Sequence, residues 1–494
     1  MSRNFLFYVI ILLLFGTGLL LVLKYGSQLQ ADRTLVLAPL AAQSTVSPTD
    51  IGRALVENLR HPLSVLLLQI IVIIGLAKML GALFLKIAQP TVIGEMVAGI
   101  LLGPSLLGML FPEVQTFLFP PASLDSLKLL SQIGVILFMF VVGIELDLRH
   151  IRQKAQAAVL VSHASIIIPF FLGAAFSLLI YRALAPSQIS FIAFALFMGI
   201  AMSITAFPVL ARIIAERGLS GSPLGNITIA CAAVDDVTAW CILAVVVTIV
   251  KAAGLGNALL TIVLAVLFVS VMLFLIRPRV DRMIGEDADN WIRGRTFMAS
   301  LLVFVFASAL LTEVIGIHAL FGAFLAGAIL PAHTHLQSFL KERLETFSSV
   351  FLLPLFFAFT GLRTQIDLLG DWQNWLTCAG IITIAIAGKL GGSMLAARWT
   401  GMNWCDAFSI GALMNTRGLM ELIVLNIGYD LGILSPQVFT MMVLMALVTT
   451  LMTGPLLSLL GYSPRSLDGA ELAKRNPGSS GHDHHLGHSP RRAH

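Results

Sequence analysis

The chain has 494 residues, of which 57% are hydrophobic and 12% are charged. Soluble domains carry about 25% charged residues, so this chain has too little polar surface to cover a globular protein in water, and a soluble enzyme is excluded. The net charge of +5 does not predict a nucleic-acid partner, because the basic residues mark the two sides of a membrane, as described below. A transmembrane helix needs about 20 apolar residues, so the length allows a dozen or more spans.

Apolar runs bounded by charged residues, proline or glycine predict an all-α polytopic membrane protein with fourteen spans. In chain order the runs cover residues 5–23, 62–86, 91–111, 128–145, 157–181, 190–214, 225–250, 257–276, 296–313, 318–331, 348–362, 375–397, 405–428 and 436–461. The run at 318–331 is short for a full crossing, and it requires tilt or local thinning of the bilayer.

The two ends of the chain differ from the spans. Residues 1–23 predict an uncleaved signal-anchor helix rather than a cleaved signal peptide, because the apolar core is long and no clear small-residue cleavage site follows. Residues 24–61 are then an extracytoplasmic loop. The His-rich tail, 462–494, lacks apolar periodicity and is predicted to be disordered and cytoplasmic. No glycine-rich nucleotide-binding motif occurs, so we expect no attached nucleotide-binding regulatory domain and no cofactor.

The basic residues predict the orientation. With a cytoplasmic N-terminus, 21 of the 31 Lys and Arg residues fall on the cytoplasmic side, eight fall outside, and Lys389 and Arg417 lie within the membrane. This excess follows the positive-inside rule. We therefore expect a multi-pass protein of a bacterial-type inner (plasma) membrane, with both termini in the cytoplasm.

Two pairs of segments indicate an internal repeat. FMFVVGIELDL at 138–148 aligns with FFAFTGLRTQIDL at 356–368, and the glycine-interrupted runs at 94–108 and 318–331 lie one span before each of them. Equivalent spans are seven crossings apart, an odd number, so the two halves, about 62–250 and 296–461, must have opposite orientations. Inverted repeats of this kind are typical of secondary transporters, whose substrate site lies at the midplane where broken helices meet.

Five ionisable residues fall inside predicted spans, where charges are costly and mark functional sites: Asp235, Asp236, Lys389, Arg417 and Glu421. Their formal charges sum to −1, which favours a cation as the ligand. Adjacent residues on a helix point about 100° apart, so one aspartate can pair with a basic residue while the other faces a cavity. Burial disfavours the charged carboxylate, so a proton and a metal cation compete for its oxygens. A buried salt bridge with Lys389 or Arg417 explains one aspartate but not both.

Two of the spans carry polar or helix-breaking residues at mid-depth. Ser203, Thr205 and Pro208 lie in one of them, and Asn415, Thr416 and Gly418 interrupt its counterpart in the second repeat. Unwound backbone at membrane depth is tolerated where it is buried or lines a cavity, and it is suited to ion coordination. Pro208 alone is also explained by a simple kink. Arg417 and Glu421 are i,i+4 neighbours, for which a structural or gating role is favoured over direct ion binding.

Four further titratable residues are expected to be solvated or structural rather than part of the site: Glu95, Glu145, Glu313 and His318. Of these, His318 lies close to Glu313 and is the kind of side chain that titrates near neutral pH. A single histidine at a helix end is more often structural.

Together, the segments GEMVAGILLGPSLLG, SITAFPVLARI, AVDDVTAW and NTRGLMELIVLNIG resemble the monovalent cation:proton antiporter-2 family, over about residues 62–461. The resemblance implies a sodium/proton-antiporter-like fold with two crossed broken helices, a homodimer, and elevator-like alternating access. It also implies that Asp236 carries the ion or proton and that Asp235 pairs with Lys389. Many members have Asn or Gln in place of Asp235, so their ion preference does not transfer; two aspartates with a lysine resemble the electrogenic sodium/proton antiporters of the wider superfamily.

The sequence therefore predicts an antiporter that exchanges Na⁺ or K⁺ for H⁺. The expected ion- and proton-binding residues are Asp235, Asp236, Ser203 and Thr205, with Asp236 as the metal-cation ligand and Lys389 as charge partner. A Kef-like cation channel remains the alternative. An intramembrane aspartyl protease is disfavoured because its two carboxylates must face each other from separate elements, and a porter of organic anions is disfavoured by the acidic site.

Overall fold

The computed structural model describes Thr17 and residues 57–87, 89–145, 155–219, 222–251, 255–285, 295–331 and 334–462. All of the predicted signal anchor except Thr17, most of the 24–61 loop, and the predicted tail beyond Tyr462 lie outside the described residues. The chain divides into two units after Ser64. The fold described below is that of the second unit.

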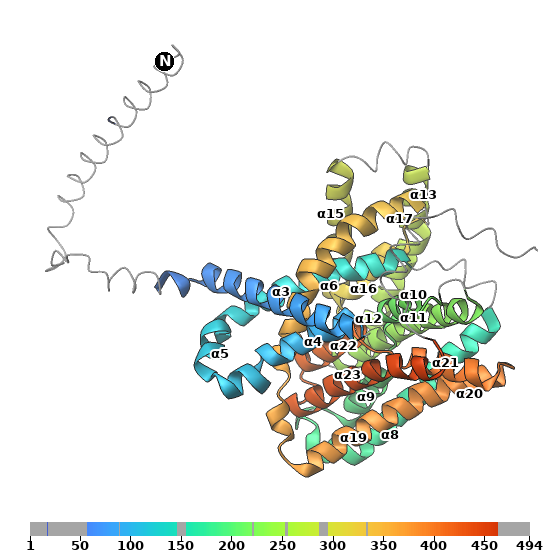
Figure 1. The fold of residues 1–494 in the computed structure, drawn as a ribbon. Helices are drawn as coiled ribbons and strands as arrows, with labels where there is room; N and C mark the ends of the chain where they lie inside the picture. The colour runs from blue at the N-terminus through green and yellow to red at the C-terminus, as the bar shows by residue number, and fades with distance from the viewer. Residues whose placement is uncertain are drawn as a thin grey trace, which may run out of the picture. The chain divides into compact units, whose positions relative to one another are not determined.

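The described chain is helical throughout (Figure 1). The first half contains α3 (Pro62–Lys86), α4 (Thr91–Leu102), η2 (Pro104–Gly108), α5 (Pro112–Leu118), α6 (Pro121–Glu145), α8 (Ala155–Leu184), α9 (Phe191–Ser203), α10 (Phe207–Glu216), α11 (Pro223–Lys251), α12 (Leu255–Ser270), η3 (Val271–Ile276) and α13 (Arg277–Gly285).

The second half contains α15 (Arg295–Ile315), α16 (Ala319–Ala328), α17 (Thr334–Leu340), η4 (Lys341–Glu345), η5 (Ser348–Leu352), α18 (Leu353–Arg363), η6 (Ile366–Leu369), α19 (Trp372–Ile386), η7 (Ala387–Gly391), α20 (Gly392–Trp399), α21 (Trp404–Met414), α22 (Leu419–Asp430) and α23 (Pro436–Leu459).

The predicted polytopic architecture is confirmed. Eleven helices in the described part of the chain are long and apolar enough to cross a membrane, and the bent pair α21 and α22 makes a twelfth span. Of the two remaining predicted spans, 318–331 contains the short helix α16, and 5–23 lies outside the described residues except for Thr17. Two predicted boundaries were wrong: the span predicted at 348–362 belongs to a helical run that begins at Leu336, and the span predicted at 128–145 begins at Pro121. The helical turns before the predicted starts at 128 and 348 contain charged residues, so they were not counted in the apolar runs.

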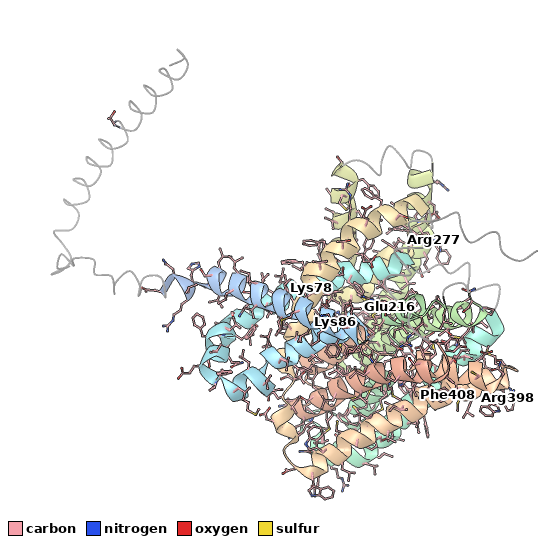
Figure 2. The ribbon with its side chains drawn as sticks, viewed as in Figure 1. Lys78, Lys86, Glu216, Arg277, Arg398 and Phe408 are labelled. Carbon is pink, nitrogen blue, oxygen red and sulfur yellow. The ribbon has the colours of Figure 1, made fainter. Side chains whose placement is uncertain are left out.

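The outward side chains fit a lipid environment. Large apolar residues are strongly exposed on several spans, including Leu179 on α8 and Phe274 on η3, with exposed fractions of 76% and 80%. Such a surface is unfavourable in water and matches hydrocarbon. Figure 2 labels Lys86 and Arg398, which lie at the C-terminal ends of α3 and α20. Charged side chains at span ends reach the polar interface.

Close helix contacts fall mainly within two groups. The first group consists of α4, α6, α15, α16 and α18, and the second of α8 to α11 with α19 to α23. Contacts between the groups, such as those of α18 with α22, are sparser. A weakly packed boundary between two well-packed groups permits one to move against the other.

Close glycine contacts hold the first group together in two equivalent places. A Cβ added at Gly361 of α18 would lie 2.0 Å from the carbonyl carbon of Gly99 on α4, and one added at Gly327 of α16 would lie 3.0 Å from Cα of Gly143 on α6. Gly143 and Gly361 occupy the same position in the two aligned segments, 138–148 and 356–368. The matching contacts support the proposed repeat, because each glycine-interrupted helix packs on the other aligned segment in the same way.

We expect Gly361→Ala to lower the thermal stability of the purified protein, because the added methyl group collides with the α4 backbone, which cannot move aside without a shift of the whole helix. Overpacking of this kind costs about 1–3 kcal/mol. Gly75→Ala on α3 is the matched control, since an added Cβ there meets nothing within 4 Å. Equal melting temperatures for the two variants would contradict the close α4–α18 contact.

Candidate functional site

The first broken span consists of α9 and α10, separated by an extended segment at Ile204–Ala206. Ile204 has φ −73° and ψ 138°, so the helix ends at Ser203. Pro208 lies in the first turn of α10, where its missing N–H would have no helical partner in any case. Pro208 therefore starts the second half of the span and does not kink a continuous helix.

The second broken span consists of α21 and α22, which are bent by 43° at the break. The two breaks cross, and the first donates hydrogen bonds to the second broken span: the Ala206 backbone N–H donates to the Thr416 carbonyl at 3.1 Å, and the Thr205 hydroxyl donates to the Met414 carbonyl at 3.3 Å. Gly418 makes the close approach possible, because an added Cβ would lie 2.9 Å from Val209 of α10. The predicted crossing of two interrupted helices is therefore present in the fold.

Lys389 binds the end of the first broken helix and one of the two aspartates. It lies in the π-helical turn η7 and is fully buried. Its ammonium group donates to Asp235 Oδ2 at 2.9 Å, to the hydroxyl and carbonyl of Ser165 at 3.0 Å each, and to the Ser203 carbonyl. Ser165 also donates to Asp235 Oδ1 at 3.1 Å. The pair is thus surrounded by polar partners, which a buried charge pair requires.

Arg417 binds the same helix end from the second broken span. Its guanidinium donates to the carbonyls of Ala201 at 2.9 Å and Met202 at 2.5 Å, and to Glu421 Oε2 at 2.8 Å. The C-terminus of a helix carries partial negative charge, so Arg417 and Lys389 together stabilise three consecutive carbonyls of α9. The equivalent end of α21 is bound by hydroxyls instead, from Thr205 to Met414 and from Thr453 to Ala412.

Asp236 differs from the other charged groups. Its side chain is only 1% exposed, and neither carboxylate oxygen has a hydrogen-bond partner among the described residues. It lines a small cavity, too small to hold a water molecule, with apolar neighbours from the α9–α10 break, α11 and α22: Ile204, Ala239, Trp240, Leu243, Met420 and Val424. An ionised carboxylate in such a place is strongly destabilised unless a proton or a cation neutralises it.

The charges of the site nearly cancel. Asp235 neutralises Lys389, and Glu421 neutralises Arg417, each within hydrogen-bonding distance. The negative charge predicted for the five residues therefore resides on Asp236. In the described part of the chain no group of three or more His, Cys, Asp or Glu side chains is arranged to hold a metal, so a cation at Asp236 would depend on backbone and hydroxyl oxygens for further ligands.

The other predicted residues lie at or near the crossing. The Ser203 hydroxyl donates to Gly199 and Ile166 carbonyls, and the Thr416 hydroxyl lies 3.4 Å from that of Thr453. Asn415 is the C-cap of α21, and its amide Oδ1 has no partner among the described residues. The hydroxyl groups of Ser203 and Thr205 therefore donate their protons to backbone carbonyls, and their oxygens can still accept a hydrogen bond or bind a cation.

Sequence reasoning missed Ser165, which binds both members of the Lys389–Asp235 pair. Its only signal is a hydroxyl in an apolar run. Serines in helices commonly bond to their own backbone, so the run gives no indication that this one reaches another helix.

Comparison with known proteins identifies the family of the chain. The family described as sodium/hydrogen exchanger, transmembrane, matches residues 69–461. The Na⁺/H⁺ antiporter NhaS4 of Synechocystis sp. is 45% identical over 80% of this chain and 97% of its own length.

More distant relatives include cation/H⁺ antiporter 17 of Arabidopsis thaliana, 40% identical over 85% of this chain, and K⁺/H⁺ antiporter 1 of Saccharomyces cerevisiae, 31% identical over 85%. The chain spans about half the length of these two relatives, 51% and 49%.

The sodium/proton antiporter MjNhaP1 of Methanocaldococcus jannaschii has a similar fold. Its TM-score is 0.57 at 12% sequence identity, over 83% of this chain and 98% of that one. At this identity the similarity concerns the fold alone. The family match covers most of the chain, and the chain belongs to the transmembrane sodium/hydrogen exchanger family of monovalent cation:proton antiporters.

Proposed function

We propose that this protein exchanges a monovalent cation for H⁺ across a membrane, with Asp236 as the site that the cation and the proton share. The observation that carries the proposal is the contrast within the site: two charge pairs are matched, whereas the buried Asp236 carboxylate lacks any partner in the described protein. The names of the relatives include both Na⁺ and K⁺ exchange, so either ion is a candidate substrate.

The coupling follows from the cost of burying a charge. An empty, ionised Asp236 is unfavourable in its apolar cavity, so the site changes its side of exposure only when a proton or a cation is bound. Protonation on one side releases the cation there, and cation binding on the other side releases the proton. Alternating access of this kind gives exchange without a continuous pore.

Asp235 and Lys389 are proposed to set the electrostatics of the site rather than to carry the cation alone. Lys389 fixes the Ser203 carbonyl at the end of α9. Three residues further along the chain, the Ala206 backbone N–H donates to the Thr416 carbonyl in the second break. Ser203 and Thr205 then supply nearby oxygens at the crossing. Arg417 and Glu421 hold the two broken helices together.

The assembly and location belong to the same proposal. We propose a homodimer in the lipid of the cell inner (plasma) membrane, with cytoplasmic termini. The sparse contacts between the two helix groups support movement of one against the other. Transported cation and H⁺ are the only ligands that this cycle requires.

Exchange is distinguishable from channel activity in proteoliposomes under a clamped membrane potential. We expect addition of NaCl or KCl to drive proton movement in the opposite direction, with cation flux that stops when protons are at equilibrium with the cation gradient. Cation flux driven by voltage alone, without proton counterflow, would show the Kef-like channel instead.

A further inference from the structure

A cavity of about 320 Å³ is lined in part by Asp430, which pairs with Lys128 and Arg363. These two basic residues are among the eight that the predicted orientation places outside, so the cavity lies on the face predicted to be extracytoplasmic. Its polar lining comes from Ser131 and Gln132 of α6, Glu313 of α15, His318, and Asn426 and Asp430 of α22. The cavity therefore joins both helix groups, and its acidic residues favour cations.

Two smaller, closed spaces lie between it and Asp236; the first has a volume of about 10 Å³, the room of about one water molecule, and the second admits none. The next one, here called the neck, is lined by Trp240, Leu243, Ala244, Val247, Ile317, His318, Phe321 and Ile427. It shares His318 and Ile427 with the large cavity, and it shares Trp240 and Leu243 with the cavity that contains Asp236. His318 is the one titratable side chain in the lining of the neck, so anything that passes from the large cavity to Asp236 by this route passes His318.

The hydrogen bonds of His318 indicate a neutral ring. His318 is the N-cap of α16, and its Nδ1 accepts from the Leu320 backbone N–H at 3.4 Å. Glu313 Oε2 accepts from the neighbouring Ala319 N–H at 2.8 Å. A ring nitrogen that accepts a hydrogen bond carries no proton, so protonation at Nδ1 would break the cap and place a positive charge in the neck.

Charged groups face His318 from three helices. Glu313 on α15 and Asp430 on α22 are acidic, and Lys251 on α11 is basic. Asp430 is itself bound by Arg363 at 2.7 Å and Lys128 at 3.1 Å, which reduces its effect. Histidine ordinarily titrates near pH 6.5, so acidification of this side below that range places a positive charge on an exposed imidazole.

We propose that His318 is a pH-sensing neck residue, which admits monovalent cations to Asp236 when its ring is neutral and repels them when its ring is protonated. The proposal rests on the proposed function, because it concerns access to the same site. It assigns to one face of the protein an inhibition by acid that is separate from competition between protons and cations at Asp236.

The test compares wild type with His318→Gln, which keeps a polar side chain but has no charge at any pH. Exchange of the transported ion, Na⁺ or K⁺, is measured at subsaturating cation while one face is acidified to about one unit below the ordinary histidine value of about 6.5 and the other is held at neutral pH. Repulsion between two unit charges about 12 Å apart changes cation access about tenfold at an effective dielectric constant of about 20, and closer approach gives a larger effect.

At neutral pH we expect His318→Gln to exchange at the wild-type rate. When the predicted extracytoplasmic face is acidified, exchange by His318→Gln should be inhibited about tenfold less than exchange by wild type. Acidification of the opposite face should inhibit both proteins equally. His163→Gln is the matched control, because that histidine is exposed on α8 and bonded to the Val159 carbonyl of its own helix. Glu313→Gln is the second variant; without the opposing carboxylate, inhibition should require a lower pH than in wild type.

Three results would overturn the neck proposal. If acid inhibition is unchanged in both His318→Gln and Glu313→Gln, all of the inhibition arises at Asp236. If His318→Gln relieves inhibition when the opposite face is acidified, the assigned route is wrong. A folded His318→Gln variant that is inactive at neutral pH would show that the ring itself is required for transport. None of these results would affect the proposed function, which is tested separately by replacement of Asp236 and by the requirement for proton counterflow.

Discussion

Asp236→Asn is expected to abolish cation-evoked proton movement in everted membrane vesicles, reducing it to the level of vesicles that lack the protein. The amide is nearly the same size as the carboxyl group, so the cavity formed with Trp240, Leu243 and Met420 is preserved. An amide, however, neither releases a proton nor neutralises a cation. The measurement is the change in a pH gradient across the vesicle membrane when NaCl or KCl is added.

The fold of the variant should be unaffected or slightly stabilised, because the substitution removes a buried charge that has no partner among the described residues. Asp406→Asn is the matched control, since Asp406 lies in the first turn of α21, near the surface, and bonds to Asn403. It should retain full exchange. Cation-evoked proton flux that survives in Asp236→Asn would exclude Asp236 as the shared site.

Removal of Lys389 is expected to have the largest effect on stability. Lys389→Met leaves Asp235 ionised and buried without its cation, and it removes the donor to the Ser165 and Ser203 carbonyls. Breaking a buried ion pair by removing one partner costs about 3–5 kcal/mol. The melting temperature of the purified variant should fall clearly below that of wild type.

The double variant Asp235→Asn/Lys389→Met separates the charge from the packing. It leaves no buried charge at this position, so it should melt at a higher temperature than Lys389→Met alone. Lys128→Met is the control, because the Lys128–Asp430 pair is partly exposed and such pairs contribute about 0–1 kcal/mol. A double variant that is less stable than the single one would show that Lys389 contributes through its backbone contacts and not through Asp235.

The spans were predictable because each one must be apolar over the thickness of the bilayer, and this requirement is visible in any window of the sequence. The same reasoning located the breaks, since Pro208 and the Asn415–Gly418 segment interrupt otherwise apolar runs. Span boundaries were less predictable where helices continue past the apolar run, as from Leu336 to the predicted start at 348. The charged turn of η4 is compatible with a helix, but it carries no apolar signal.

The intramembrane charges were identifiable because charge is rare in such a sequence, but their pairing was not determined by the residues alone. Reasoning from spacing left Asp235 open to pairing with either Lys389 or Arg417, and the resemblance implied Lys389. In the structure Lys389 contacts Asp235, while Arg417 pairs with its own i,i+4 neighbour and with two α9 carbonyls. Contacts of this kind depend on the crossing of distant helices, which local patterns do not encode.

The series of cavities from Glu313 and His318 to Trp240 was not predictable for the same reason. In the sequence Glu313 and His318 resemble ordinary helix-end residues, and both do bind the N-terminus of α16. Only the packing of α11, α16 and α22 around the neck places His318 between two cavities.

The most direct test of the shared site measures proton release on cation binding. Purified protein in a weak buffer with a pH indicator is titrated with NaCl or KCl, and binding is followed in parallel by calorimetry. The shared site predicts that the wild-type protein releases protons as it binds the transported cation and that Asp236→Asn releases none. Cation binding to wild type without proton release, or equal release by Asp236→Asn, would contradict it.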